Sequence, residues 1–268
     1  MKTKKSDKKV KIHVPINQNK LLEKTLEEVN KNKELYALWK VINVNAIDRY
    51  GVTDHGVVHF QIVANIALRL CRILVKNGVK MSAVSDFGLK NEHAEVIVFL
   101  ASIMHDLGMS IHREGHEEFS LFLANSMLRE ILGFLPIEER TIVISEVLHA
   151  IIGHRNYGKP FTFEAGIVRV SDALDMSEGR SRIPYEQGKT DIHSVSASAI
   201  DNVEIREGKD CPIRIVITMN NSAGIFQVDE LLKKKITGSM IEKFIEVVAY
   251  VKEKQEKKLV KEYKIKHA

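Results

Sequence analysis

An apolar run over residues 96–104 ends in two polar neighbours, His105 and Asp106, and Leu107-Gly108 follows them. The run is hydrophobic enough for a protein interior, so we expect its helix and the adjoining doublet to be buried. A buried charge without a partner costs several kcal/mol, so something must compensate the aspartate. A metal ion would do so, and the doublet therefore predicts a metal site at the end of a core helix.

Apolar spacing predicts a chain that is helical over its first two thirds. From about residue 20 to residue 77 the apolar residues recur at helical intervals, and Asn77-Gly78 is a typical helix end. Further helices are predicted over residues 92–106, 116–132, 138–153 and 163–177. These segments together predict a helical bundle.

After Arg182 the pattern changes from helical to mixed. Residues 194–205 hold short alternating segments, and the apolar residues from 213 to 219 alternate strictly with others, so a β-hairpin or small sheet is expected. A last helix is predicted over about residues 228–255. The expected fold class is mainly α, with a smaller C-terminal α+β unit. We predict a basic tail over 1–19, the bundle over 20–185, the α+β extension over 186–256 and a second basic tail over 257–268.

The distribution of charge argues against nucleic acid as a partner. The net charge is +5, but residues 1–11 carry +5 and residues 251–268 carry +4, which leaves −4 on the rest of the chain. Basic chain ends are more often solvated than bound to a polyanion. No stretch approaches the about 20 apolar residues of a membrane-spanning helix, and no hydrophobic signal region follows the lysine-rich start, so a cytoplasmic protein without a membrane partner is expected.

Two further polar residues lie in apolar helical patterns. His59 opens the stripe that continues through Ile62 and Ile66, and Asp172 lies within the apolar segment 167–175. A single histidine on such a face is more often a core residue than a ligand, but here it joins a set. With His105-Asp106, these residues make a mixed nitrogen and oxygen site suited to Mn, Fe, Zn, Co or Ni.

Two more histidines occupy similar positions. His116 begins a predicted helix, and His154 continues the stripe of Val143, Val147 and Ala150. Each alone is as consistent with core packing as with ligation. Together they suggest a second ion, bridged to the first by Asp106. Two divalent ions with these ligands would leave positive charge that attracts an anion, and would acidify a bound water.

The order of these residues resembles the H…HD…D signature of the HD-domain metal-dependent phosphohydrolase superfamily, matched here by His59, His105-Asp106 and Asp172. His105-Asp106-Leu107-Gly108 also looks like its HD-Ile/Leu-Gly variant, and the resemblance covers about residues 50–180. The segment from Asp172 to Gly188 and beyond resembles uncharacterised, mainly archaeal members with an α+β extension. The resemblance implies an HD-domain helical bundle that binds one or two divalent ions and hydrolyses phosphoesters.

His116 and His154 resemble the additional histidines of the superfamily's binuclear branch, which includes HD-GYP cyclic-dinucleotide phosphodiesterases and dinucleoside-tetraphosphate hydrolases. This sequence has no GYP tripeptide after His154-Arg155, and His149 and His154 stand where the HD-GYP group has adjacent histidines. Cyclic dinucleotides are therefore not the first expected substrate.

Other residues are candidates for proton transfer and phosphate binding. His55 lies one turn before His59 and beside Asp54. We expect it either to donate a proton in the site or to be a surface or helix-capping histidine. His149 has two possible roles. It is either a metal ligand, and so a catalytic residue of the site, or it forms a hydrogen bond to one of the ligands. Cationic side chains near the ligands are expected either to hold the substrate phosphate or to be solvated: Arg180, Arg182, Arg113, Arg155 and Lys189.

The expected function is hydrolysis of a phosphoester in a nucleotide or other small phosphorylated molecule, through a metal-bound hydroxide. Asp106 is the expected bridging catalytic residue. A di-iron oxygenase with the same ligands and a regulatory nucleotide-binding module are the alternatives. For a helical core with an α+β appendage, a homodimer is the expected assembly.

Overall fold

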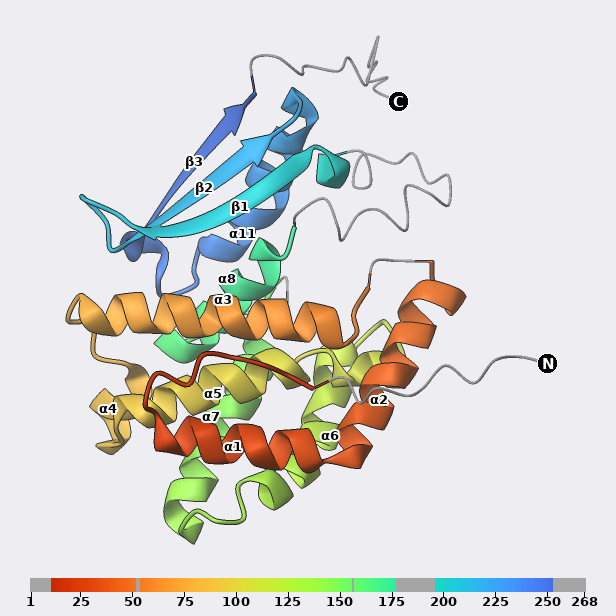
Figure 1. The fold of residues 1–268 in the computed structure, drawn as a ribbon, viewed down its shortest axis with the longest axis vertical. Coiled ribbons are helices and arrows are strands. Elements are labelled where there is room, and N and C mark those ends of the chain that lie inside the picture. The colour runs from red at the N-terminus through yellow and green to blue at the C-terminus, as the bar shows by residue number, and fades with distance from the viewer. Residues whose placement is uncertain (1–10, 52–53, 156, 177–195, 253–268) are drawn as a thin grey trace.

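The computed structural model describes residues 11–51, 54–155, 157–176 and 196–252. Within this part of the chain the protein is mainly α, as predicted, with a small sheet near the C-terminus. Figure 1 shows the sheet as a separate layer on one side of the helical bundle, with α3 nearest to it. The predicted boundary between residues 185 and 186, and most of both predicted tails, lie outside the described residues.

The bundle consists of α1 (Lys20–Lys31), α2 (Lys33–Asn43), the π-helix η1 (Val44–Arg49), α3 (Val57–Lys76), α4 (Ser82–Phe87), α5 (Asn91–Met104), the 3-10 turn η2 (Leu107–Ser110), α6 (His116–Ile131), α7 (Ile137–Gly153) and α8 (Phe163–Leu174). Local sequence fixes several of these ends. The side chains of Asn19 and Asn32 cap α1 and α2 by accepting backbone N–H groups, and α3 ends at Asn77 before Gly78, whose φ is +81°.

Helix α5 forms the centre of the bundle. Every residue from His93 to Met104 except Glu95 is buried, and the helix packs against α1, α3, α7 and α8. Such a helix is apolar on all sides because it has neighbours on all sides. The predicted core position of the run that leads to His105 is therefore confirmed.

Helix α3 is the one described helix that is long and apolar enough, by length and composition, to cross a membrane. Its apolar side chains, such as Phe60, Leu68 and Leu74, are buried inside the protein, and it packs against α5 and α8. This is the burial expected of a core helix in a soluble protein, which passes the same composition test.

The C-terminal unit contains a three-stranded sheet in the order β1-β2-β3. The predicted hairpin is present, because β1 (Ile200–Glu207) pairs antiparallel with β2 (Ile213–Met219). The third strand, β3 (Ile245–Val251), pairs in parallel with β2, with Ile213 opposite Ile245. Between β2 and β3 the chain forms a 3-10 turn η3 (Ser222–Gly224), a π-helix η4 (Gln227–Leu232), the short helix α11 (Lys233–Ile236) and a 3-10 turn η5 (Glu242–Phe244).

The predicted helix over residues 228–255 is wrong in its second half. The helix ends at Ile236, and Gly238 adopts a φ of +69°, a left-handed conformation that glycine accepts readily. The following residues are rich in β-branched types, and Ile245, Val247 and Val251 pair with β2 instead of continuing a helical stripe. The apolar residues of this segment have an average spacing that fits a helix, but in the structure they lie on the two faces of strand β3.

The C-terminal unit docks closely on α8. A Cβ added to Gly166 would lie 1.7 Å from the carbonyl oxygen of Ser239, so only glycine permits this approach. The buried guanidinium of Arg169 donates hydrogen bonds to the carbonyl oxygens of Lys234 and Lys235, at 3.3 and 3.0 Å. These contacts fix α11 against the helix that carries Asp172.

Candidate metal centre

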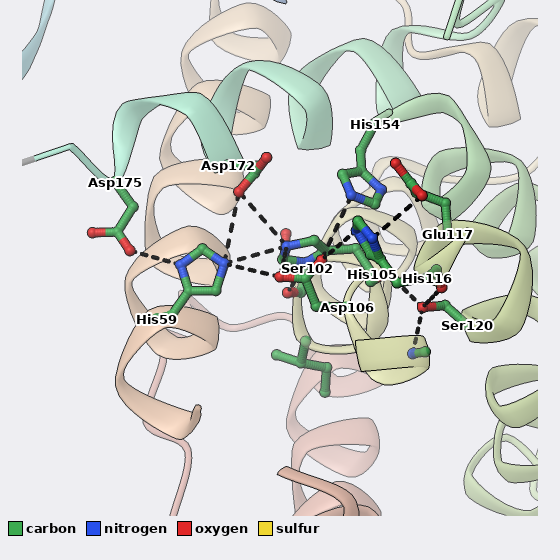
Figure 2. A network of polar contacts seen from close by, with 12 residues as sticks. His59, Ser102, His105, Asp106, His116, Glu117, Ser120, His154, Asp172 and Asp175 are labelled. Atoms are coloured by element: carbon green, nitrogen blue, oxygen red, sulfur yellow. Dashed lines mark hydrogen bonds and ion pairs between the residues drawn. The ribbon is translucent and has the colours of Figure 1, made fainter. Parts of the chain in front are cut away.

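Six predicted ligands come together at the ends of five helices. His59 lies in the first turn of α3, His105 and Asp106 follow the last residue of α5, and His116 begins α6. His154 follows α7 directly, and Asp172 lies in the last turn of α8. Figure 2 shows their side chains pointing toward one another from these separate elements.

Close packing of α6 against η2 holds the doublet in place. A Cβ on Gly108 would lie 2.0 Å from the carbonyl oxygen of His116, which explains glycine after His105-Asp106-Leu107. The buried hydroxyl of Ser120 contacts the carbonyl oxygens of His105 and His116, both at 2.7 Å, and accepts the N–H of Gly108 at 2.8 Å. The side chain of Ser120 thus links the backbone of His105, before Asp106, to that of Gly108, after it.

Hydrogen bonds determine which nitrogen of each histidine faces the centre. Nδ1 of His105 lies 2.9 Å from the carbonyl oxygen of Ser102, and Nδ1 of His116 lies 2.8 Å from that of Arg113. Nδ1 of His154 similarly lies 2.5 Å from the carbonyl oxygen of Ile151. A carbonyl oxygen only accepts, so each Nδ1 carries a proton and donates. In the neutral ring, each Nε2 then has a lone pair directed into the centre.

His59 has a carboxylate in place of a carbonyl. Its Nδ1 donates to Oδ2 of Asp175 at 2.6 Å, and both side chains are buried. Asp175 was not among the residues predicted for the site. Its spacing of three residues from Asp172, which returns to the same face of a helix, was the available signal.

One half of the centre surrounds Oδ2 of Asp106. This oxygen lies 3.3 Å from Nε2 of His105 and 3.7 Å from Nε2 of His59. The two Nε2 atoms are 3.3 Å apart. Oδ1 of Asp172 lies 3.6 Å from Nε2 of His59 and 3.7 Å from Nε2 of His105. His59, His105 and Asp172 therefore form a group whose donor atoms could share one ion.

The other half surrounds Oδ1 of the same aspartate. This oxygen lies 3.1 Å from Nε2 of His116 and 3.7 Å from Nε2 of His154. Glu117, which the sequence did not single out, joins these two histidines in another group of possible ligands, and His105, Asp106 and His154 form a group that spans both halves. Asp106 thus presents one oxygen to each half, as its predicted bridging position requires.

The chemistry of these atoms fits a bound cation. When the four rings are neutral, their Nε2 lone pairs and the oxygens of the two carboxylates are all acceptors, and acceptors this close repel one another unless a proton or a metal ion lies among them. Imidazole nitrogen and carboxylate oxygen together suit divalent transition metals. Asp106 and Asp172 would be the anionic ligands, and the histidines the neutral ones.

The electrostatics of the centre favour positive charge. Although burial opposes it, the carboxylates of Asp106 and Asp172 raise the pKa of His105 to about 10. His105 in turn holds the pKa values of both carboxyl groups well below their usual range, despite their burial. Burial, followed by the charges of His105 and Lys235, lowers the pKa of His154 to about 3. The carboxylates are therefore ionised at neutral pH.

The other predicted site residues lie in varied positions. His55 packs beside His59, with ring centroids 5.5 Å apart. His149 stacks on Phe161 and its Nε2 accepts the N–H of Phe161 at 3.2 Å, so it is held by this contact and is in none of the described ligand groups.

Two of the five predicted phosphate-binding cations fall within the described residues. Arg155 forms an exposed ion pair with Glu118 at 2.7 Å, and Arg113 is an exposed residue whose carbonyl oxygen supports His116. Arg180, Arg182 and Lys189 lie outside the described residues. Lys235, which was not predicted, contacts the centre from α11, with Nζ 3.5 Å from Oδ2 of Asp172.

Comparison with known proteins identifies the family to which the segment with these residues belongs. The sequence profile of the HD domain matches residues 57–177, a range that contains all six predicted ligands. The chain is 41% identical over 230 residues to the uncharacterized protein MJ1020 of Methanocaldococcus jannaschii. The aligned region covers 85% of this chain and 89% of that protein. No solved structure gave a significant match. The chain therefore belongs to the HD-domain family, a superfamily of metal-dependent hydrolases that bind divalent metals.

Proposed function

We propose that the protein is a phosphohydrolase that cleaves a phosphoester in a nucleotide or other small phosphorylated molecule. The observation that carries the proposal is the position of Asp106, whose Oδ2 faces His59 and His105 and whose Oδ1 faces His116 and His154. A carboxylate between two ions is a recurrent device for in-line displacement at phosphorus. The HD-domain family membership supports the same reaction class.

The described residues suggest how two ions would be held. His59, His105, Asp172 and Oδ2 of Asp106 would hold one, and His116, His154 and Oδ1 of Asp106 the other, with Glu117 in reach of the second. When bound, such ions supply Lewis acidity that lowers the pKa of water and neutralises phosphate oxygens. The ligand types favour Mn, Fe, Co, Ni or Zn.

The chain's own residues would orient the ligands and handle protons. Asp175 and the three backbone carbonyls hold the imidazole rings so that each Nε2 faces inward. Phe60 packs on His105, with ring centroids 5.7 Å apart, and keeps water from that side of the centre. We assign His55, half-buried beside His59, to proton donation to the leaving oxygen.

We also propose a cytoplasmic location. Cys71 and Cys211 are both free, and Cys71 is buried in α3. Free thiols of this kind suit a reducing compartment.

The test begins with protein purified without chelator. Elemental analysis should find a divalent transition metal, and the loaded protein should hydrolyse bis(p-nitrophenyl) phosphate or a member of a nucleotide panel. Asp106→Asn should weaken metal binding at both halves of the centre and abolish turnover. Asp229→Asn is a matched control, because Asp229 lies on the surface and pairs with Lys233.

Three results would contradict the proposal. Hydrolysis that persists in metal-free Asp106→Asn protein would rule out the assigned centre. Oxygen consumption by the iron-loaded protein, together with no turnover of any phosphoester, would support the di-iron oxygenase. Tight nucleotide binding without turnover in any divalent metal would support the regulatory module.

A further inference from the structure

A lysine of the C-terminal unit reaches the candidate metal centre. Nζ of Lys235 lies 3.5 Å from Oδ2 of Asp172 and donates a hydrogen bond to the carbonyl oxygen of His154 at 2.5 Å. It therefore contacts one residue from each half of the centre. The side chain is only 13% exposed, although it belongs to a short helix near the surface.

Lys235 differs from the two lysines that precede it. Lys233 pairs with Asp229 and Lys234 pairs with Glu230, one turn back along the same helical segment, and their side chains are 70% and 66% exposed. The third lysine of the run turns inward instead. Among the described residues, it is the one lysine or arginine that forms an ion pair with Asp106 or Asp172.

The backbone that carries Lys235 is firmly anchored. Arg169 donates to the carbonyl oxygen of Lys235 at 3.0 Å and also to the carbonyl oxygens of Gly153 and Arg155, on both sides of His154. The guanidinium thus joins the lysine to the segment of a predicted ligand. The close approach of Ser239 to Gly166 holds the segment that follows α11 against α8.

Lys235 lies on the side of the centre that solvent reaches. The side chains of His59 and His105 are 1% exposed, whereas those of Asp172 and His116 are 18% and 20% exposed. Lys235 contacts Asp172, one of the two more open ligands. A molecule that enters from solvent would meet this lysine beside the ligands.

The charge of Lys235 would not help a cation to bind. An ammonium group close to the ligands repels a divalent ion, and a neutral side chain of similar size would fill the space without that repulsion. The charge becomes favourable when an anion occupies the mouth of the centre. An ammonium carries three N–H donors, and the contacts to His154 and Asp172 leave one for such an anion.

We propose that Lys235 binds a phosphate oxygen of the substrate, so that the C-terminal unit completes the active site. This inference rests on the proposed phosphohydrolase function. It assigns to the α+β unit a direct role in substrate binding. The predicted ligands all lie within residues 57–177, whereas this residue lies outside that range.

Inorganic phosphate is the probe that tests the assignment. Its affinity for the full-length, Mn²⁺-loaded protein would be measured by calorimetry for wild type, Lys235→Met, Lys235→Arg and the control Lys233→Met. Lys235→Met should weaken phosphate binding at least about tenfold, the loss of roughly one charge-assisted hydrogen bond. Lys235→Arg should retain part of the affinity, and Lys233→Met, which removes the same charge from the surface, should bind as wild type does.

Affinity for Mn²⁺, measured on the same proteins, distinguishes the possible failures. Lys235→Met should bind Mn²⁺ as tightly as wild type or more tightly, because a repelling charge is removed. Loss of Mn²⁺ by this variant would show that the lysine only positions Asp172, and phosphate binding equal to wild type would show that it does not touch the anion. If wild type itself bound Mn²⁺ but neither bound phosphate nor turned over any phosphoester, the proposed function would fall together with this assignment.

Discussion

Nδ1 of His59 donates a direct hydrogen bond of 2.6 Å to Oδ2 of Asp175, and both groups are buried. The carboxylate holds the ring with Nε2 toward the centre and makes that nitrogen more basic. We expect Asp175→Asn to weaken binding of Mn²⁺ by about 10- to 100-fold, the usual effect of losing such a partner. Competition with a fluorescent metal indicator would measure this, with Asp229→Asn as control. Unchanged affinity would show that the carboxylate has no such role.

The two halves of the centre should lose metal separately. His116→Ala should reduce a two-ion protein to one ion, because Nε2 of His116 faces only Oδ1 of Asp106. His59→Ala should remove the other ion, and Asp106→Asn should weaken both. Elemental analysis after gel filtration gives the stoichiometry. A wild-type protein that holds a single ion, or a His116→Ala variant that holds two, would refute the binuclear assignment.

Glu146 should make stability depend on pH independently of the metal centre. It is buried in α7, and its Oε2 has no hydrogen-bond partner among the described residues. Burial, and then the charges of Glu164 and Asp86, raise its pKa from 4.5 to about 7. The folded protein therefore retains this proton up to about pH 7, whereas the unfolded chain loses it near pH 4.5, so stability falls as pH rises between these values.

Glu146→Gln removes that ionisation. Relative to wild type, the variant should gain stability between pH 5 and pH 8, by up to about 3 kcal/mol for a shift of this size. Urea denaturation of both proteins at several pH values gives the difference, in which titration of the histidines cancels. A difference that does not change with pH would mean that Glu146 ionises normally.

Gly166→Ala should loosen the C-terminal unit. The new methyl group would require the backbone at Ser239 to move, because the two atoms would otherwise be 1.7 Å apart. Overpacking of this kind costs about 1–3 kcal/mol, so we expect a lower melting temperature. Gly153→Ala is the control, since its methyl group would have ordinary contacts at 3.5 Å and beyond. Equal melting temperatures for the two variants would contradict the close docking.

Sequence periodicity was most successful for long helices with one buried face. The helices predicted over 116–132 and 138–153 are observed as His116–Ile131 and Ile137–Gly153. The strand Ile245–Val251 was missed because its pairing with β2 depends on residues some thirty positions away. Local spacing carries no information about such a partner.

The candidate site also contains both residues that the sequence predicted and residues, such as Lys235, that it did not. The predicted ligands could be recognised because polar residues at the ends of apolar helices need compensation, and the structure brings all six together. Lys235 resembled its neighbours Lys233 and Lys234 in the sequence, and only the docking of α11 on α8 distinguishes it. The assignment of His149 stays a prediction, although the structure shows its ring stacked on Phe161.

The contact between Asp172 and Lys235 also has a consequence for synthesis of the protein. A ribosome releases the chain from the N-terminus, and domains fold as they emerge. All six predicted ligands leave the ribosome before Lys235 does, so a nascent bundle could take up metal while Asp172 still lacks its ammonium partner. The maturing protein would then pass through a metallated form that binds phosphate poorly, and it would acquire its substrate affinity only after α11 has docked on α8.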